Sequence, residues 1–209
     1  MTMEKKYRLL ENDTITVGSG TLYRIEALKD FANVKKGDKG GYIESEDNLS
    51  HFGNCWVYGE AEVSENACVY DNACVCGNAL VYGNACVYDN AQVYGNAQVY
   101  DNAWVYDNAQ VYDNAQVYGN AWVYGYAVVF GDARIRGTVD YYVGKNVWSS
   151  GRYFTYTRSN KMWKVGCFYG TGEELISKAY RDSEVSGREY KRVVEYVEAM
   201  YADLEKDKE

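Results

Sequence analysis

Thiols, carboxylates, large aromatic rings and one imidazole are the side chains of this 209-residue sequence that could carry chemistry. Of its six cysteines, Cys74 and Cys76 form a Cys-x-Cys pair, and Cys68 and Cys86 flank this pair at a greater distance along the chain. A tetrahedral zinc site needs four converging ligands. A proton-transfer catalyst needs a base within reach of an open substrate site, and His51 is the only histidine. We therefore predict no metal site and no catalytic residue.

Aromatic and acidic side chains recur every 18 residues. The same interval separates Cys68 from Cys86 and Trp104 from Trp122. If residues separated by this interval stack on one another, these side chains gather on one face of the protein. Trp and Tyr are enriched where partners bury surface, and carboxylates can steer a basic partner. The predicted partner-binding site consists of Tyr88, Trp104, Tyr106, Trp122 and Tyr124, with Asp71, Asp89 and Asp107 beside them.

Each part of this site has a simpler alternative. Stacked aromatic rings stabilise neighbouring strands by about 0.2–1 kcal/mol per pair, and such a patch can also join identical chains into a dimer or trimer. The aspartates are also typical solvated turn residues, or could hold a cation through oxygen ligands. The cysteines at 68, 74, 76 and 86 suit outward positions filled by small side chains, and we expect Cys55 and Cys167 to lie in the core.

A six-residue period determines where all of these side chains lie. Val recurs once in every hexad from Val57 to Val129 without insertion, and Ala follows each Val by four residues. In an Ala-x-Val-Tyr strand, Ala and Val point to one side and the other two residues to the opposite side. The Gly/Asp-Asn pair that follows suits a tight turn. We predict a solenoid of three hexads per coil and about five coils, with His51 and Ser45 in the Val position of the earliest hexads.

The motif Val-Tyr-(Gly/Asp)-Asn-Ala-x resembles the hexapeptide repeat of left-handed parallel β-helix proteins, and the resemblance implies the left hand. The opening YRLLENDT, the GGYIE segment and the closing GCFYGTGEEL are similar to uncharacterised hexapeptide-repeat proteins of bacteriophages and prophages. Such proteins are sometimes labelled transferases, by analogy with hexapeptide acyltransferases. Those enzymes use a histidine base and a loop extruded from the helix, and a γ-class carbonic anhydrase on the same helix needs three histidine ligands. One histidine and an uninterrupted repeat fit neither enzyme.

The segments outside the repeat are expected to cover its ends, because an open β-helix exposes unpaired strand edges. Residues 1–44 are predicted to form a small N-terminal β cap, with strands at 7–10 and 22–27, and residues 45–137 the repeat helix. Residues 138–209 are predicted to form a C-terminal α+β domain of short strands and two helices, the first beginning at a capping box that starts with Thr171. The second helix is predicted from apolar residues at 3/4 spacing: Tyr190, Val193, Val194, Val197, Met200, Tyr201 and Leu204. The fold class is therefore mainly β.

The repeat is acidic, whereas the flanking segments are balanced. Residues 45–134 contain 11 acidic side chains and one basic side chain, although the whole chain has 30 and 22. Nucleic-acid binding requires cations that displace counterions from phosphates, so we expect no direct DNA or RNA binding by the repeat. No segment approaches the roughly 18 apolar residues of a membrane-spanning helix, and the N-terminus lacks the apolar core of a signal peptide. These features predict a cytoplasmic protein that does not bind membranes.

Together these patterns favour a non-catalytic binding protein without a cofactor, whose partner is a host protein. The phage resemblance implies that it blocks or sequesters this host component in an infected or lysogenic bacterium, with an antiviral defence system as the candidate target. An acidic, elongated solid could also imitate nucleic acid toward a basic protein. Three alternatives remain: a sponge for a small signalling nucleotide, a structural protein that self-assembles, and a hexapeptide acyltransferase that uses His51.

Overall fold

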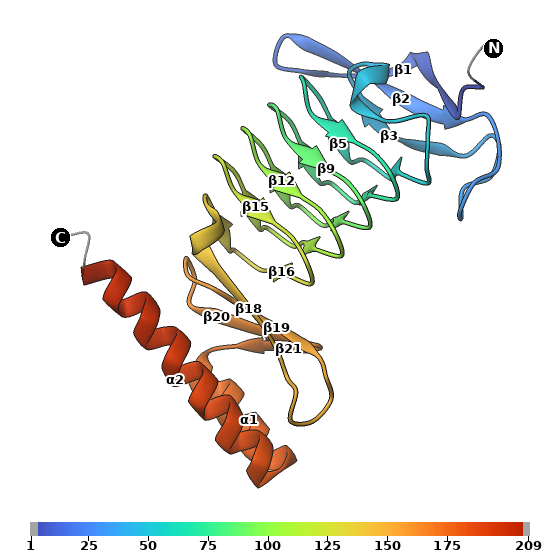
Figure 1. The fold of residues 1–209 in the computed structure, drawn as a ribbon. Coiled ribbons are helices and arrows are strands. Elements are labelled where there is room, and N and C mark those ends of the chain that lie inside the picture. Colours follow the sequence, from blue (N-terminus) through green and yellow to red (C-terminus); the bar gives the residue numbers. More distant parts are fainter. Residues whose placement is uncertain (1–3, 207–209) are drawn as a thin grey trace.

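The repeat folds into a parallel β-solenoid that lies between two caps of different construction (Figure 1). The computed structural model describes residues 4–206. Strands three hexads apart along the chain pair in parallel. The strand that contains Trp104, for example, pairs with the strand that contains Trp122. Three hexads therefore make one coil, and three parallel sheets run along the solenoid. The predicted fold class, a mainly β solenoid of about five coils with a cap at each end, is confirmed.

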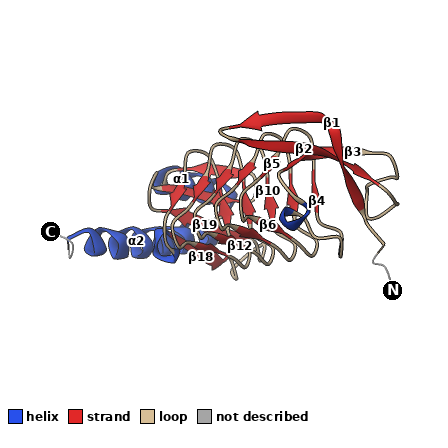
Figure 2. Cartoon of the chain, turned by 90° about the horizontal axis from the view of Figure 1, so that it is seen from above, coloured by secondary structure: helices blue, strands red, loops and turns tan. Residues whose placement is uncertain are grey.

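Each hexad contributes one two-residue strand, and turns separate these strands along the solenoid (Figure 2). The first sheet consists of β6 (Cys68–Val69), β9 (Cys86–Val87), β12 (Trp104–Val105) and β15 (Trp122–Val123). The second consists of β4 (Trp56–Val57), β7 (Cys74–Val75), β10 (Gln92–Val93), β13 (Gln110–Val111) and β16 (Val128–Val129). The third contains β5 (Glu62–Val63), β8 (Leu80–Val81), β11 (Gln98–Val99), β14 (Gln116–Val117) and β17 (Arg134–Ile135).

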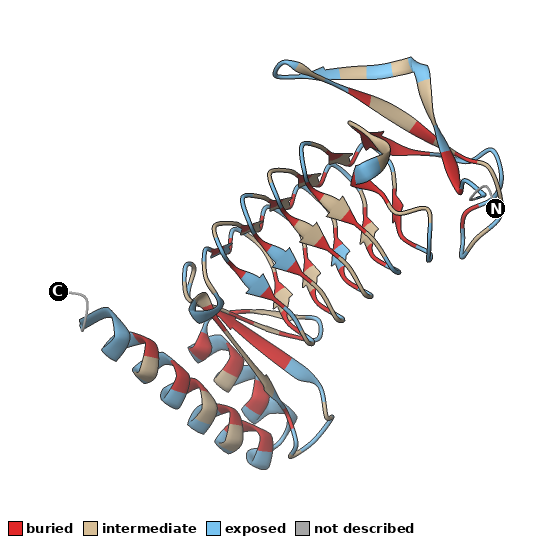
Figure 3. Ribbon diagram, turned by 45° about the horizontal axis from the view of Figure 1, so that its top comes forward, coloured by how far each residue is buried: buried red, intermediate tan, exposed pale blue. Residues whose placement is uncertain are grey.

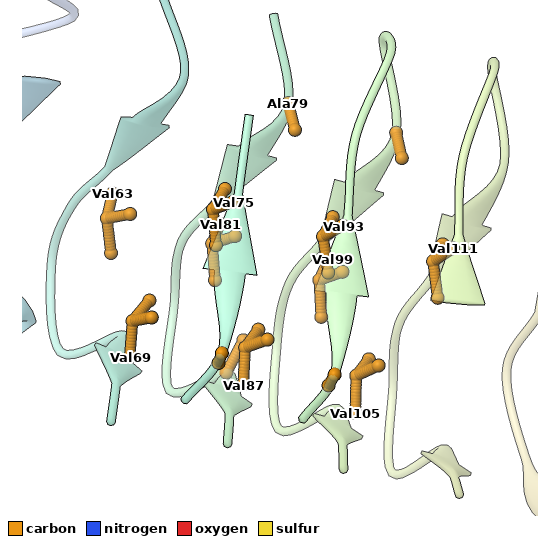
Figure 4. Close-up of a cluster of buried hydrophobic side chains, with 14 of the residues drawn as sticks. Val63, Val69, Val75, Ala79, Val81, Val87, Val93, Val99, Val105 and Val111 are labelled. Atoms are coloured by element: carbon orange, nitrogen blue, oxygen red, sulfur yellow. The ribbon is translucent and has the colours of Figure 1, made fainter. Parts of the chain in front are cut away.

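The valine and alanine of each hexad fill the narrow interior of the solenoid. Val93 and Val105 are fully buried, as are Ala91 and Ala103, and valines of successive coils stand in rows along the solenoid (Figure 4). Buried inward positions alternate with partly or fully exposed outward positions along each coil (Figure 3). Full burial of one Val side chain is worth about 1.5–3 kcal/mol relative to exposure. Burial of the valine rows therefore contributes strongly to the stability of the solenoid.

A left-handed backbone conformation at every corner explains the Gly and Asp residues of the repeat. Gly adopts positive φ without steric cost, and Asp tolerates it better than most residues do. The asparagines that follow form amide ladders, in which Asn84 Nδ2 donates to Asn102 Oδ1 at 3.0 Å. The residues with φ between +56° and +74° at the first turn position are Gly59, Glu65, Asp71, Gly77, Gly83, Asp89, Gly95, Asp101, Asp107, Asp113, Gly119, Gly125 and Gly131.

The register of the earliest hexads differs from the sequence prediction, which is wrong here. Leu49, rather than His51, pairs with Val69, and Ile43 takes the inward position predicted for Ser45. Both pairings join residues 20 apart, so two extra residues are accommodated between positions 49 and 57. The loop at 50–55 uses them to turn toward the N-terminal cap. A periodic sequence conceals this insertion, because the segment HFGNCW still matches the turn pattern.

The N-terminal cap extends the third sheet beyond the first coil. It comprises β1 (Tyr7–Val17), β2 (Gly20–Ala27) and β3 (Lys39–Ile43), followed by a 3-10 helix at Glu46–Asn48. β1 and β2 form an antiparallel hairpin, and β3 pairs antiparallel with β2 and parallel with β5. The two predicted strands are present, and both are longer than predicted. The cap covers Trp56 completely, although this residue occupies an outward position of its hexad.

The C-terminal cap is an antiparallel sheet covered by two helices. A 3-10 helix at Thr138–Asp140 leads into β18 (Tyr141–Lys145), β19 (Tyr153–Thr157), β20 (Met162–Val165) and β21 (Phe168–Gly170), and then into α1 (Gly172–Asp182) and α2 (Glu184–Lys206). The predicted capping box is confirmed, because Thr171 Oγ1 accepts the Glu174 N–H and the Glu174 carboxylate accepts the Thr171 N–H. Within residues 4–206, no helix combines the length and the apolar character needed to cross a membrane.

One prediction about the C-terminal cap is wrong. Cys167 is exposed rather than in the core, because it lies in the turn between β20 and β21. Leu204 lies in the predicted second helix and is exposed near its end. The stripe itself is buried earlier in α2, where Val194 and Val197 pack into the core of the cap. Position along an element thus limits burial even where the apolar spacing continues.

Side-chain oxygens of the C-terminal cap bind the backbone of the last coil. Thr155 Oγ1 accepts the N–H of Val128 at 2.9 Å, and Ser159 Oγ accepts the N–H of Arg134 at 2.7 Å. The Asp140 carboxylate accepts the N–H groups of residues 136 and 137. Unpaired backbone groups at a sheet edge are costly when buried and invite association when exposed. These bonds therefore terminate the solenoid.

Candidate functional site

The predicted partner-binding residues lie on the first sheet and on the corner that follows it. Trp104 in β12 and Trp122 in β15 are in register, and their rings stack with centroids 5.7 Å apart and planes 18° apart. Trp104, Trp122 and the neighbouring Tyr124 are well exposed, with exposed fractions of 40%, 48% and 43%. We call these three residues, together with Tyr88 and Tyr106, the Trp face.

A ladder of tyrosines runs beside the two tryptophans. Tyr70, Tyr88, Tyr106 and Tyr124 stack with successive centroid distances of 4.8, 5.0 and 5.4 Å, and Tyr88 meets Trp104 edge to face at 6.2 Å. Burial raises the pKa of Tyr88 to about 12, with smaller contributions from the neighbouring phenol and carboxylates. The phenol therefore stays neutral near pH 7 and can donate a hydrogen bond to a partner.

The aspartates at 71, 89 and 107 form a column at the corner beside this ladder, each with φ close to +57°. The Asp89 carboxylate accepts the backbone N–H of Asp107 at 3.3 Å, and the Asp107 carboxylate accepts that of Gly125 at 3.0 Å. The Asp89 and Asp107 side chains thus stabilise the turn of the next coil while remaining partly exposed, whereas Asp71 is exposed. Among residues 4–206, no group of three or more His, Cys, Asp and Glu side chains could hold a metal ion.

Asp107→Val is expected to destabilise the protein by about 1–3 kcal/mol. A β-branched residue is strained at positive φ, and the hydrogen bond to Gly125 is lost. Asp107→Gly also loses this bond but relieves the backbone, so we expect it to cost less than about 1 kcal/mol. Urea unfolding of both variants measures the difference. Equal stability of the two would contradict a backbone constraint at this corner.

The structure adds one aromatic residue that the sequence prediction omitted. Tyr126 is 49% exposed, and its ring stacks on Tyr153 of β19 with centroids 4.2 Å apart. Tyr126 lies two residues after Tyr124, in the turn that follows β15, and extends the exposed aromatic surface toward the C-terminal cap. A signal was present in the sequence, because Tyr126 replaces the asparagine that occupies the second turn position in the ten preceding hexads.

His51 lies at the junction between the N-terminal cap and the solenoid. Its ring stacks on Tyr7 with centroids 4.3 Å apart, Nδ1 accepts the backbone N–H of Lys6 at 3.2 Å, and Nε2 lies 3.4 Å from a Glu46 carboxylate oxygen. Only 7% of the side chain is exposed, so little of the ring is open to a substrate. The neighbouring Lys6 ammonium donates to the Cys55 carbonyl at 2.8 Å, and burial lowers the pKa of Lys6.

The outward cysteines are divided between two sheets, as their spacing predicts. Cys68 in β6 and Cys86 in β9 are in register, with their Sγ atoms 2.8 Å apart. Cys74 lies in β7 of the second sheet, and Cys76 follows that strand. The two pairs therefore do not converge on one tetrahedral site. Cys55 is fully buried, as expected.

The repeat sequence matches a known class of solenoid repeat. A profile of the YdcK beta solenoid repeat matches residues 91–107, 97–113, 109–125 and 115–131. The repeat is similar to the YdcK beta-solenoid repeat. These matches run from β10 to β16 and include both tryptophans of the Trp face, so they support a β-solenoid repeat protein and concern neither cap. No curated protein matches the chain.

Proposed function

We propose that this protein is a non-catalytic binding protein that blocks or sequesters a basic host protein through its Trp face. The observation that carries the proposal is the stacked, exposed pair of Trp104 and Trp122. The resemblance to hexapeptide-repeat proteins of bacteriophages and prophages supports a role in the cytoplasm of an infected or lysogenic bacterium. An antiviral defence protein is the target that this role favours.

The exposed tryptophans of the solenoid lie on one sheet, and Trp56 on the second sheet is buried by the N-terminal cap, whereas tyrosine stacking occurs on all three sheets. The positions equivalent to the tryptophans hold Gln98 and Gln116 on the third sheet, where Tyr82 and Tyr100 nevertheless stack with centroids 5.0 Å apart. The fold thus accepts glutamine at this position. Coil stability accounts for the tyrosines but does not require two large exposed indoles, so their presence supports contact with a partner.

Charge complementarity favours a basic partner. The solenoid segment 45–134 carries 11 acidic side chains and one basic side chain, and part of this charge is the aspartate column beside the Trp face. Carboxylates steer a positively charged surface toward the aromatic contacts and repel nucleic acid. The indoles would then fill the apolar centre of the interface, and the carboxylates its polar rim.

Affinity capture from a bacterial host lysate tests the proposal when two matched variants are compared. Trp104→Gln/Trp122→Gln introduces the side chain that the fold accepts at this position, and Gln98→Ala/Gln116→Ala changes the equivalent positions on the third sheet. We expect the unmodified protein and the third-sheet variant to retain the same basic protein near stoichiometry. The tryptophan variant should bind it at least about tenfold more weakly, because buried Trp anchors contribute about 2 kcal/mol or more.

Far-UV circular dichroism establishes that both variants are folded. Undiminished binding by the tryptophan variant, or equal loss from both variants, would overturn the role of the Trp face. Recovery of a nucleotide without any protein would overturn the proposal in favour of a sponge. Recovery of further copies of this chain alone would overturn it in favour of self-assembly.

A further inference from the structure

We propose that Cys68 and Cys86 form a thiol–disulfide exchange site that reacts with low-molecular-weight disulfides of the glutathione class. The two residues begin the row of outward side chains that continues with Trp104 and Trp122 on the first sheet. Their Sγ atoms are 2.8 Å apart. The proposed binding function uses neither thiol, so the two proposals stand or fall separately.

The geometry of in-register parallel strands suits a disulfide between these residues. Neighbouring strands lie about 4.8 Å apart, which is within the 4.4–6.8 Å range of Cα separations in disulfides. Cys68 and Cys86 both point outward from the solenoid and are half-buried. A small disulfide can therefore reach the sulfur atoms, and bond formation requires little movement of the backbone.

The two thiols differ in acidity, which gives each a distinct role. Either thiol of this pair can donate a hydrogen bond to the other sulfur. With Cys68 as the donor, the bond lowers the pKa of Cys86 to about 7. The same bond, together with burial, raises the pKa of Cys68. The thiolate is the attacking species in exchange reactions. In this arrangement Cys86 is the nucleophile, and Cys68 is the resolving thiol.

The exchange proceeds in two balanced steps. The Cys86 thiolate attacks one sulfur of the disulfide RSSR, forms a mixed disulfide and releases RS⁻. Cys68 then loses its proton to this thiolate and attacks the Cys86 sulfur, which forms the Cys68–Cys86 bond and releases a second RS⁻. The second RS⁻ takes up the proton that Cys86 lost to solvent. Two protein thiols are oxidised, and one RSSR is reduced to two RSH.

The second thiol pair has a different geometry. Cys74 and Cys76 are two residues apart along one chain segment, where side chains on the same face are about 6.6 Å apart, at the upper limit for a disulfide. The neighbouring Cys74 thiol also lowers the pKa of Cys76 to about 7. We therefore expect the mixed disulfide at Cys76 to persist, whereas Cys68 attacks the mixed disulfide at Cys86 and releases the small thiol.

Incubation of the folded protein with oxidised glutathione, followed by mass spectrometry, tests the site. Trypsin is unsuitable, because residues 45–133 contain neither Lys nor Arg. Chymotrypsin separates the cysteines, since tyrosines at 70 and 82 lie between Cys68, the 74/76 pair and Cys86. We expect a cross-linked peptide joining Cys68 to Cys86 in the unmodified protein. The control Cys74→Ser/Cys76→Ser should form the same cross-link and lack the glutathione adduct expected at Cys76.

Cys68→Ser removes the resolving thiol and should trap one glutathione on Cys86. Gel filtration separates intramolecular from intermolecular bonds, and circular dichroism establishes that the variant is folded. Glutathione on both Cys68 and Cys86 without a cross-link would overturn the proposal. The proposal would also be overturned if Cys68 and Cys86 remained free thiols in the folded protein. A disulfide between Cys74 and Cys76 instead of one between Cys68 and Cys86 would overturn it as well.

Discussion

Val93→Asp is expected to destabilise the protein by at least about 4 kcal/mol, or to prevent cooperative folding of the solenoid. Val93 is fully buried and pairs with Val75 and Val111 of the adjacent coils. A carboxyl group at this position enters the apolar valine rows, where burial of an unpaired polar or charged group is strongly unfavourable. Because each coil is stabilised by its neighbours, one unstable coil interrupts the whole stack.

Gln92→Asp is the matched control, because it introduces the same side chain at the adjacent outward position, which is exposed. We expect the free energy of unfolding of this variant to lie within about 0.5 kcal/mol of the original value, as for most surface substitutions. Thermal and urea unfolding, followed by circular dichroism, compare the three proteins. Similar losses of stability in both variants would contradict the inward direction assigned to Val93.

Trp56→Ala is expected to destabilise the protein by about 3–5 kcal/mol, the usual cost of removing a large buried aromatic side chain. Trp56 occupies the same outward position of its hexad as Trp104, but the N-terminal cap covers it. Its ring meets Tyr7 edge to face with centroids 6.0 Å apart, and Phe31 at 5.3 Å. Removal of the indole leaves a cavity between the cap and the first coil.

Trp104→Ala is the control, because its ring is partly exposed and stacks on Trp122. Loss of one cross-strand aromatic pair is expected to cost about 0.2–1 kcal/mol. Urea unfolding gives the two free energies, and amide hydrogen exchange in β1 to β3 shows whether the Trp56 variant loses protection in the cap. A cost for Trp104→Ala as large as that for Trp56→Ala would contradict the burial of Trp56 as the cause.

The solenoid could be predicted from the sequence because each of its rules is local. Side chains alternate along a strand, so the period of six places Val93 inside and Gln92 outside without knowledge of the rest of the chain. The preference for positive φ at each corner explains Gly and Asp there, as at Asp107. The capping box at Thr171 is equally local, since its two hydrogen bonds join residues three apart.

The candidate site could be predicted only in part. The interval of three hexads brings Trp104 and Trp122 together, because three hexads make one coil. The hydrogen bonds of the aspartate column were not predicted, since they require the turn of one coil to lie directly beneath the carboxylate of another. Tyr126 was omitted although the replaced asparagine marks it in the sequence, and its stacking on Tyr153 of the C-terminal cap could not be derived from the repeat.

The sequence by itself determined the coil, the direction of each side chain and the order of residues on each sheet, because these depend on neighbours one hexad and three hexads away. Tertiary structure decided which side chains are exposed. The N-terminal cap buries Trp56 and stacks Tyr7 on His51, and Leu49 rather than His51 takes the inward position. Cys167 is exposed because the hairpin turn that carries it extends beyond the cap core. These outcomes depend on contacts between segments that share no period, which the repeat cannot encode.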